Sequence, residues 1–231
     1  MKSIFIRIGL TAMLAIPTAH ADLKHEVVNP SQPPLNEQSS RIEVESIFSY
    51  DCPVCYQLDP SVMELKAKYS DDIEVVHVPA PLTEAWAVYS RAYYIAEALG
   101  ILDTAHKVIF DAIVDGDGKV MQNGADMAKF FRDNFLIQSD QTLALYKSDA
   151  VRDKLIHNYQ RLKGYDLTLV PAIVIEGKYL ITGHTAGSVQ SMVDEAEAII
   201  NKIKSTRSSN VFADAAASKT MKAAGAGKAP L

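Results

Sequence analysis

The chain contains two cysteines, Cys52 and Cys55, and they form the motif Cys-Pro-Val-Cys. The motif lies where an extended apolar segment gives way to a segment with helical periodicity. A thiol at the start of a helix faces unpaired backbone N–H groups that favour its thiolate, and a second thiol one turn later can close a disulfide with it. The motif therefore restricts the fold to one that ends a strand at the start of a helix, and it suits repeated oxidation and reduction.

A structural disulfide and a metal site are the two alternatives for this motif. On the chain-entropy argument, a disulfide closing a loop of about four residues stabilises a fold by only about 2 kcal/mol, against about 3 kcal/mol for fifteen residues. Two thiolates supply half of a tetrahedral metal site, and the other ligands would have to come from histidines scattered along the chain. Redox chemistry is therefore the leading interpretation, with no cofactor and no resident metal expected.

Residues 1–21 have the pattern of an export signal. Lys2 and Arg7 precede a mostly apolar run over residues 8–16, and the sequence Ala-His-Ala before Asp22 is typical of a signal peptidase site. The run is shorter than the ~20 apolar residues of a membrane span. We expect a mature chain that begins at Asp22 and resides in an oxidising compartment, where disulfides persist.

The net charge and the length of the chain limit its binding partners and the number of its domains. Loss of Lys2 and Arg7 changes the formal net charge from −5 to −7, and the chain has no dense basic run. This charge pattern excludes a nucleic-acid partner. A mature chain of about 210 residues is long enough for one domain carrying an insertion.

Strand and helix signals alternate in the first part of the chain. Residues 41–49 are rich in β-branched and aromatic side chains and predict a strand. A helix is expected to open at Asp51 or Cys52, because Pro53 suits a first helical turn and apolar residues then recur at helical spacing. Residues 73–78 predict a second strand, which a right-handed crossover makes parallel to the first.

The segment 82–162 has only helical signals, in the stretches 82–100, 103–114, 125–134 and 148–162. Strand signals return at 172–175 and 178–181, joined by a tight turn. An amphipathic helix is expected from residue 188 to about 204. Residues 205–231 are alanine-rich with little to bury, so we predict a flexible tail there.

Three segments of the sequence resemble the DsbA-type thiol:disulfide oxidoreductases. Phe48–Gln57 resembles the active-site segment of that family, and Leu82–Val88 resembles its first inserted helix. Val170-Pro171-Ala172, followed by Gly177-Lys178-Tyr179, resembles its cis-proline loop and hairpin. The order and spacing agree over about residues 26 to 204, which is a far more specific signal than an isolated Cys-x-x-Cys.

The resemblance implies an α/β fold, namely a thioredoxin fold with an inserted all-helical domain. The thioredoxin-like domain would comprise residues 22–81 plus 163–204, and the helical insertion residues 82–162. It also implies a periplasmic monomer that donates its disulfide to reduced, unfolded polypeptides. A membrane oxidase of the DsbB type would then reoxidise it.

The resemblance assigns the catalytic roles to Cys52 and Cys55. Exchange proceeds by attack of a thiolate on sulfur, so Cys52 would ionise easily and Cys55, more buried, would close the bridge. Pro53 and Val54 lie between them and support the site. Pro171 would be cis, which would bring Val170 beside the cysteines with its backbone free to pair with an extended substrate.

The sequence departs from the best-known family members in two places. Val54 stands where they have histidine, and it can neither donate a hydrogen bond nor carry positive charge. Asp51 adds a negative charge that raises the pKa of a nearby thiol, so we predict a less extreme oxidant. Ser46 stands where the family often has a buried glutamate, which leaves Glu45 or water to transfer a proton to Cys55.

Two other functions remain open from the sequence. A disulfide reductase or isomerase could use the same fold, and a metal-binding module could use both thiolates. Trp86, Tyr89 and Tyr93 are expected in the core. The histidines at positions 77, 106, 157 and 184 are interpreted as structural or solvent-facing.

Overall fold

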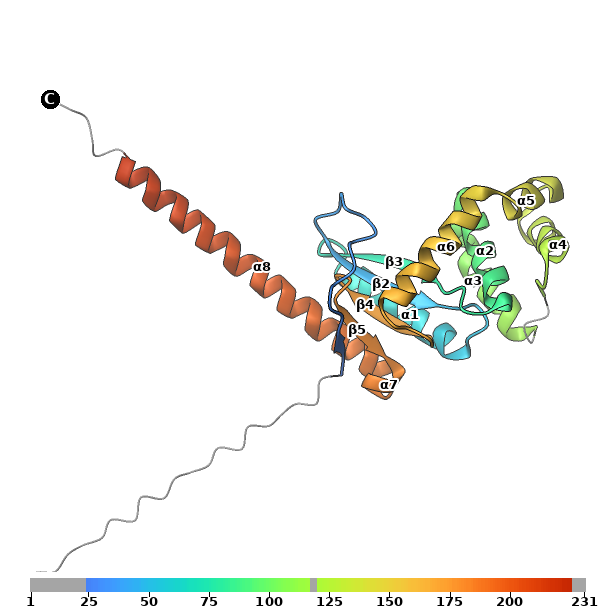
Figure 1. Ribbon diagram of the computed structural model, residues 1–231, viewed down its shortest axis with the longest axis horizontal. Helices are drawn as coiled ribbons and strands as arrows, with labels where there is room; N and C mark the ends of the chain where they lie inside the picture. Colours follow the sequence, from blue (N-terminus) through green and yellow to red (C-terminus); the bar gives the residue numbers. More distant parts are fainter. Residues whose placement is uncertain (1–23, 117–119, 226–231) are drawn as a thin grey trace, which may run out of the picture.

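A computed structural model of the protein describes residues 24–116 and 120–225, and the predicted export signal over 1–21 lies outside them. The described strands form one five-stranded sheet in the order β1-β5-β4-β2-β3 (Figure 1). Strands β2 and β3 are parallel, as predicted, and the other neighbours are antiparallel. The strands are β1 (Glu26–Val27), β2 (Ile42–Phe48), β3 (Ile73–Pro79), β4 (Ala172–Ile175) and β5 (Tyr179–Thr182).

Five consecutive helices lie between β3 and β4, so the predicted thioredoxin fold with an all-helical insertion is confirmed. The helices of the described chain are α1 (Pro53–Lys68), α2 (Glu84–Ala98), α3 (Leu102–Asp115), α4 (Gly124–Phe135), α5 (Ser139–Tyr146), α6 (Asp149–Gly164), α7 (Gly183–Ala186) and α8 (Val189–Gly225). The sequence did not predict β1, α5 or α7. Each is short, and in α5 only Thr142 is buried, so no apolar stripe marks it.

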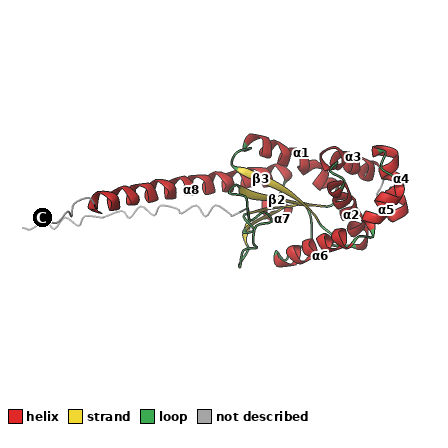
Figure 2. Cartoon of the chain, turned by 90° about the horizontal axis from the view of Figure 1, so that it is seen from above, coloured by secondary structure: helices red, strands yellow, loops and turns green. Residues whose placement is uncertain are grey.

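The sheet separates two layers of helices (Figure 2). Side chains alternate between the faces of a strand, so Val44 of β2 packs with α1 and α8, whereas Ile47 packs with Leu162 at the end of α6. Phe48, the last residue of β2, already belongs to a third cluster, the core of the helical insertion. The segment that follows β2 therefore lies between the sheet and the insertion.

A buried ion-pair cluster fixes α6 to β2. The Arg161 guanidinium donates to both carboxylate oxygens of Glu45, with Nε–Oε2 at 2.7 Å and Nη2–Oε1 at 2.8 Å, and lies 3.3 Å from Glu43 Oε1. The Tyr165 hydroxyl donates to Glu45 at 2.5 Å. Helix α6 runs without a break across the predicted 162/163 boundary, and its last turn packs on the sheet.

The last helix is longer than predicted. It was expected to end near Lys204, but α8 continues to Gly225, so the first part of the predicted tail is helical, and its last residues, 226–231, lie outside the described residues. The flexible tail was predicted because this segment has few large apolar residues to bury. Its alanines and lysines nevertheless have high helix propensity and can form a helix without burying an apolar face. Beyond the sheet, α8 projects away from the body of the protein (Figure 1). None of the helices in the described residues is both long and apolar enough to cross a bilayer.

Candidate active site

The cysteine motif occupies the start of α1, as the sequence predicted. Cys52 is the N-cap residue in an extended conformation, and Pro53 is the first helical residue. The backbone N–H of Cys55 donates to Cys52 Sγ at 3.2 Å, so sulfur takes the capping position that a serine or aspartate oxygen usually fills. The helix terminus thus places its unpaired donors around Cys52.

The Cys52 thiol is acidic in this environment. A hydrogen bond from the Cys55 thiol is the largest influence; together with the backbone N–H groups of Cys55 and Val54 it outweighs burial and lowers the pKa of Cys52 to about 7. The charge of Asp51 raises that pKa, in the direction expected from the sequence. The result is a thiol that is partly ionised at neutral pH.

The Cys55 thiol has the opposite character. It is buried, with 2% of its surface exposed against 8% for Cys52. Burial, followed by the hydrogen bond and charge of Cys52, raises the pKa of Cys55 far above that of an ordinary thiol. The two sulfurs of the reduced protein are therefore chemically distinct, one easily ionised and one held protonated.

The loop before β4 completes the site. The Val170–Pro171 peptide bond is cis, as the resemblance implied, and Cys52 Sγ lies 3.8 Å from the carbonyl oxygen of Val170. Two apolar side chains are exposed next in sequence to these residues: Val54 at 45% and Leu169 at 73%. The reactive sulfur thus lies between an apolar helix turn and an apolar loop.

Buried aromatic residues pack in the core next to the cysteine motif. Phe48 and Tyr50 are buried with their ring centroids 5.0 Å apart, and they belong to the same core cluster as both cysteines. Tyr89 and Tyr93 are buried and Trp86 is partly buried against this core, which confirms their predicted structural position.

Glu45 is not placed to exchange a proton with Cys55. Residues Glu43, Glu45 and Ile47 share the face of β2 turned to α6, and Arg161 and Tyr165 bind the Glu45 carboxylate there. Ser46 has the opposite orientation, toward α1, because side chains alternate along a strand. The suggestion of Glu45 as proton donor is therefore wrong.

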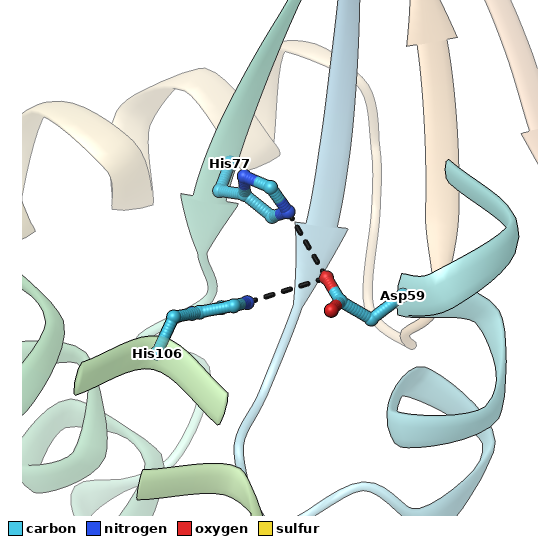
Figure 3. A group of neighbouring side chains, drawn as sticks. All are labelled: Asp59, His77 and His106. Carbon is cyan, nitrogen blue, oxygen red and sulfur yellow. Dashed lines mark hydrogen bonds and ion pairs between the residues drawn. The ribbon is translucent and has the colours of Figure 1, made fainter. Parts of the chain in front are cut away.

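A second polar group lies on the α1 side of the sheet (Figure 3). His77 of β3 and His106 of α3 both point at Asp59 of α1, with Nε2–Oδ1 distances of 3.0 Å and 3.2 Å. The other ring nitrogen of His106, Nδ1, lies 2.8 Å from the Tyr50 hydroxyl. The cluster is thus linked through Tyr50 to the segment that carries the cysteines.

The four histidines divide between the two predicted alternatives, structural and solvent-facing. His77 and His106 are largely buried and hydrogen-bonded, whereas His157 and His184 are exposed. Burial raises the pKa of the Asp59 carboxyl, but hydrogen bonds from His106 and His77 outweigh it and hold that pKa below its ordinary value. Sequence spacing could not reveal the group, because its members come from three elements, although Asp59 lies one helical turn after Cys55.

Comparison with known proteins places the chain in a family. The DSBA-like thioredoxin domain family matches residues 43–195. A thiol:disulfide interchange protein DsbA of Azotobacter vinelandii is 31% identical over 170 residues, covering 74% of this chain and 78% of that protein. Its counterpart in Pseudomonas aeruginosa is 29% identical over 201 residues, covering 84% and 94%.

Solved structures agree with the sequence matches. The crystal structure of Pseudomonas aeruginosa DsbA superimposes with a TM-score of 0.72 at 25% identity, covering 80% of this chain and 94% of that one. The DsbA oxidoreductase from Xylella fastidiosa has the same fold, with a TM-score of 0.70. The cysteine pair at the start of α1, the helical insertion and these matches together show that the chain belongs to the DsbA family of thiol:disulfide oxidoreductases.

Proposed function

We propose that this oxidoreductase works in the oxidising direction, as a dithiol oxidase that donates the Cys52–Cys55 disulfide to reduced proteins. The observation that carries the proposal is the similarity to DsbA thiol:disulfide interchange proteins over most of the chain, and the lowered pKa of Cys52, about 7, is consistent with it. An ordinary cysteine thiol has a pKa of about 8.5. Because the fold stabilises the Cys52 thiolate, it stabilises the reduced protein and makes the disulfide a better electron acceptor.

The proposed reaction has two exchanges. A substrate thiolate attacks Cys52 Sγ, a bond forms between those two sulfurs, and the Cys52–Cys55 bond breaks with Cys55 leaving and taking up a proton. A second substrate thiolate then attacks the substrate sulfur of this mixed disulfide and releases Cys52 as a thiolate. The substrate loses two thiol protons and two electrons, and the enzyme becomes the reduced dithiol.

The acidities of the two sulfurs suit these roles. A low thiol pKa makes Cys52 a good leaving group in the second exchange. The raised pKa of Cys55 favours its protonated form once it has left, which limits its reverse attack on the mixed disulfide. Pro53, Val54, Val170 and Pro171 are proposed as the supporting residues.

The expected oxidant is moderate in strength. The difference between about 8.5 and about 7 corresponds to about 2 kcal/mol, or roughly 45 mV for a two-electron couple. Active-site thiol pKa values range from about 3.5 in a strongly oxidising DsbA to about 7 in thioredoxin. The pKa of Cys52 lies at the less acidic end of that range, because Val54 supplies no charge or hydrogen bond to the thiolate and the charge of Asp51 raises the pKa.

The surface around Cys52 supports extended polypeptides as substrates. Val54, which follows Pro53 in the cysteine motif, and Leu169, which precedes Val170, both expose apolar side chains. The Val170 carbonyl faces Cys52 in the loop just before β4, where an extended chain can add backbone hydrogen bonds. Such contacts bind unfolded chains with little sequence preference.

Export to the periplasm and reoxidation by a DsbB-type membrane oxidase are part of the same proposal. The signal pattern of residues 1–21 and the family membership support the location. Docking of the oxidase near the cysteines is supported by a cavity of about 510 Å³ lined by Val88 and Tyr89. Tyr89 belongs to the same core cluster as both cysteines, which relates this cavity to the active site.

Equilibration with glutathione tests the direction of the reaction. The oxidised fraction of the Cys52–Cys55 pair is measured at a series of glutathione ratios, and catalysis of oxidative refolding of a reduced model protein is measured in parallel. We expect a pair more oxidising than glutathione and accelerated refolding. An equilibrium on the reducing side of glutathione would instead establish the reductase or isomerase function, which a pKa near that of thioredoxin would also suit.

Two substitutions test the roles of the cysteines. Cys52→Ser is expected to abolish turnover, because it removes the attacked sulfur. Cys55→Ala, mixed with a substrate that contains a disulfide, is expected to accumulate a mixed disulfide: the Cys52 thiolate attacks one substrate sulfur, the other substrate sulfur leaves as a thiolate, and no Cys55 thiol remains to resolve the adduct. Trapping of substrate on Cys55 in the Cys52→Ser protein would reverse the assignment.

A further inference from the structure

The Asp59–His77–His106 cluster has a composition and an arrangement that its structural role does not require. Two imidazoles and one carboxylate converge from three elements, and their Nε2 and Oδ1 atoms all lie within 4.8 Å of one another. Two imidazoles with one carboxylate form a common three-ligand set for divalent transition metals such as Zn²⁺, with water in the fourth position. We propose that this cluster is a Zn²⁺-type metal site, separate from the cysteine pair.

The distances between the donor atoms suit a tetrahedral ion. An ion about 2.0–2.1 Å from each donor places the donors roughly 3.4 Å apart. Two of the three separations, from Asp59 Oδ1 to His77 Nε2 and to His106 Nε2, are already 3.0 Å and 3.2 Å. The ion would therefore replace two hydrogen bonds with bonds of its own, and only the two imidazoles need a small adjustment.

An outer partner for one ligand is in place. A metal-bound histidine usually holds its second ring nitrogen in a hydrogen bond, which fixes the ring and its tautomer. His106 Nδ1 lies 2.8 Å from the Tyr50 hydroxyl, which can accept from an Nδ1–H as well as donate. Tyr50 is buried in the core, so this partner is rigidly positioned.

The cluster is also accessible. It lines a cavity of about 710 Å³ together with Met63, Lys66 and Asp103, among others. The side chains of Asp59, His77 and His106 are 21%, 15% and 13% exposed, which leaves room for an ion and a water ligand to enter. The cavity is also lined by two lysines, Lys66 and Lys107, whose positive charge would oppose a cation. The Lys107 ammonium donates to the Asp111 carboxylate at 2.7 Å, which offsets its charge.

Zinc titration of the oxidised, untagged protein tests the proposal. In the oxidised form the Cys52–Cys55 disulfide removes both thiolates as ligands, so any binding there is independent of the proposed exchange reaction. Isothermal calorimetry is expected to give one Zn²⁺ per chain. Tyr50→Phe removes the outer hydrogen-bond partner of His106 and is expected to weaken zinc binding by about 10–100-fold. His77→Gln and His106→Gln each remove a ligand and are expected to weaken it by more than that.

Matched variants separate ligation from folding. Asp59→Asn keeps an oxygen that accepts from both histidines but removes the charge that a cation needs, so it should retain the fold and lose most of the affinity. His157→Gln makes the same replacement at an exposed position and should bind as the parent does. The proposal is overturned if Asp59→Asn and His77→Gln bind zinc as tightly as His157→Gln, or if zinc binds only to reduced protein.

Discussion

The acidity of Cys52 is set by a few atoms in its immediate surroundings. The Cys55 thiol and the first backbone N–H groups of α1 stabilise the thiolate, and the carboxylate of Asp51 opposes them. The exposed valine between the cysteines contributes no charge and no polar side chain. The redox strength of the pair can therefore be changed at neighbouring positions without altering either sulfur.

Replacement of Asp51 by asparagine tests this balance. Asp51→Asn removes the negative charge that raises the pKa of Cys52, so the thiol should become more acidic and the pair more oxidising. The pH dependence of Cys52 alkylation and the glutathione equilibrium measure both changes. Asp71→Asn, at an exposed position beyond the end of α1, is the control. An unchanged Cys52 pKa in Asp51→Asn would contradict the account.

The stability of the reduced protein should depend on pH through Cys52. Between about pH 7 and the ordinary thiol pKa of about 8.5, the unfolded chain keeps a proton that the folded protein has released. Stability therefore rises with pH across this window, by up to about 2 kcal/mol, and the gain is lost as the pH falls through about 7. Urea unfolding of the reduced protein at several pH values measures the effect.

The comparison that isolates this contribution uses Cys52→Ser. Both proteins retain Cys55, and its burial, the largest cause of its raised pKa, is common to both, so Cys55 is expected to stay protonated in both folded proteins across this window. The difference in unfolding free energy should grow across the window from about pH 7 to 8.5. A difference independent of pH would mean that folding does not change the acidity of Cys52.

At the scale of elements, the attachment of α6 to β2 depends on buried charge. Arg161→Met removes the cation that pairs with Glu45 and Glu43 and leaves two carboxylates buried. Removal of one partner from a buried ion pair destabilises by about 3–5 kcal/mol. Urea denaturation of the oxidised protein should show a loss of this size.

Arg152→Met is the matched control on the same helix. Arg152 pairs with Asp149 at the surface, with both side chains more than half exposed. Surface pairs of this kind contribute about 0–1 kcal/mol. Equal losses in the two variants would show that the Glu45–Arg161 cluster contributes no more than a surface pair.

Elements with a strong local signal could be predicted from the sequence, and short ones could not. The strand ending at Phe48, the helix opening at Cys52 and the hairpin all have regular apolar spacing or clear turn residues. Strand β1 has two residues and its position depends on pairing with β5, which is a tertiary contact. Likewise Asp59, His77 and His106 converge only through the packing of α1, β3 and α3.

At the scale of the whole molecule, the cysteines lie between the sheet and the helical insertion. Both sulfurs belong to the core cluster built mainly by the insertion, whereas α1 itself packs on the sheet. The order of elements and the family resemblance were sufficient to predict this topology. The length of α8 was not predictable in the same way, because residues 205–231 are alanine-rich and contain few large apolar residues that would mark a buried helix.

The C-terminal part of α8 should contribute little to stability. Ile203 packs on the sheet core, Lys204 pairs with Asp72 and Arg207 pairs with Glu176, but beyond them the helix runs away from the body (Figure 1). Removal of residues 210–231 should change the unfolding free energy by no more than about 0.5 kcal/mol, as for surface changes.

A longer truncation provides the contrast. Removal of residues 202–231 also deletes Ile203 and the two ion pairs, so it should destabilise measurably more. Full burial of an isoleucine contributes about 1.5–3 kcal/mol, and the partly buried Ile203 should contribute a fraction of that amount. Equal stability of the two truncated proteins would contradict the assignment of the packing boundary near Arg207.

The central claim is that the start of α1 makes one sulfur far more acidic than the other. Its most direct test is a pH titration of thiolate formation in the reduced protein, followed by limiting alkylation to identify the sulfur that reacts. The account predicts a single thiol that ionises with a pKa of about 7 and is alkylated first, at Cys52. Ionisation of Cys52 at about 8.5, as in a free thiol, or first alkylation at Cys55, would contradict it.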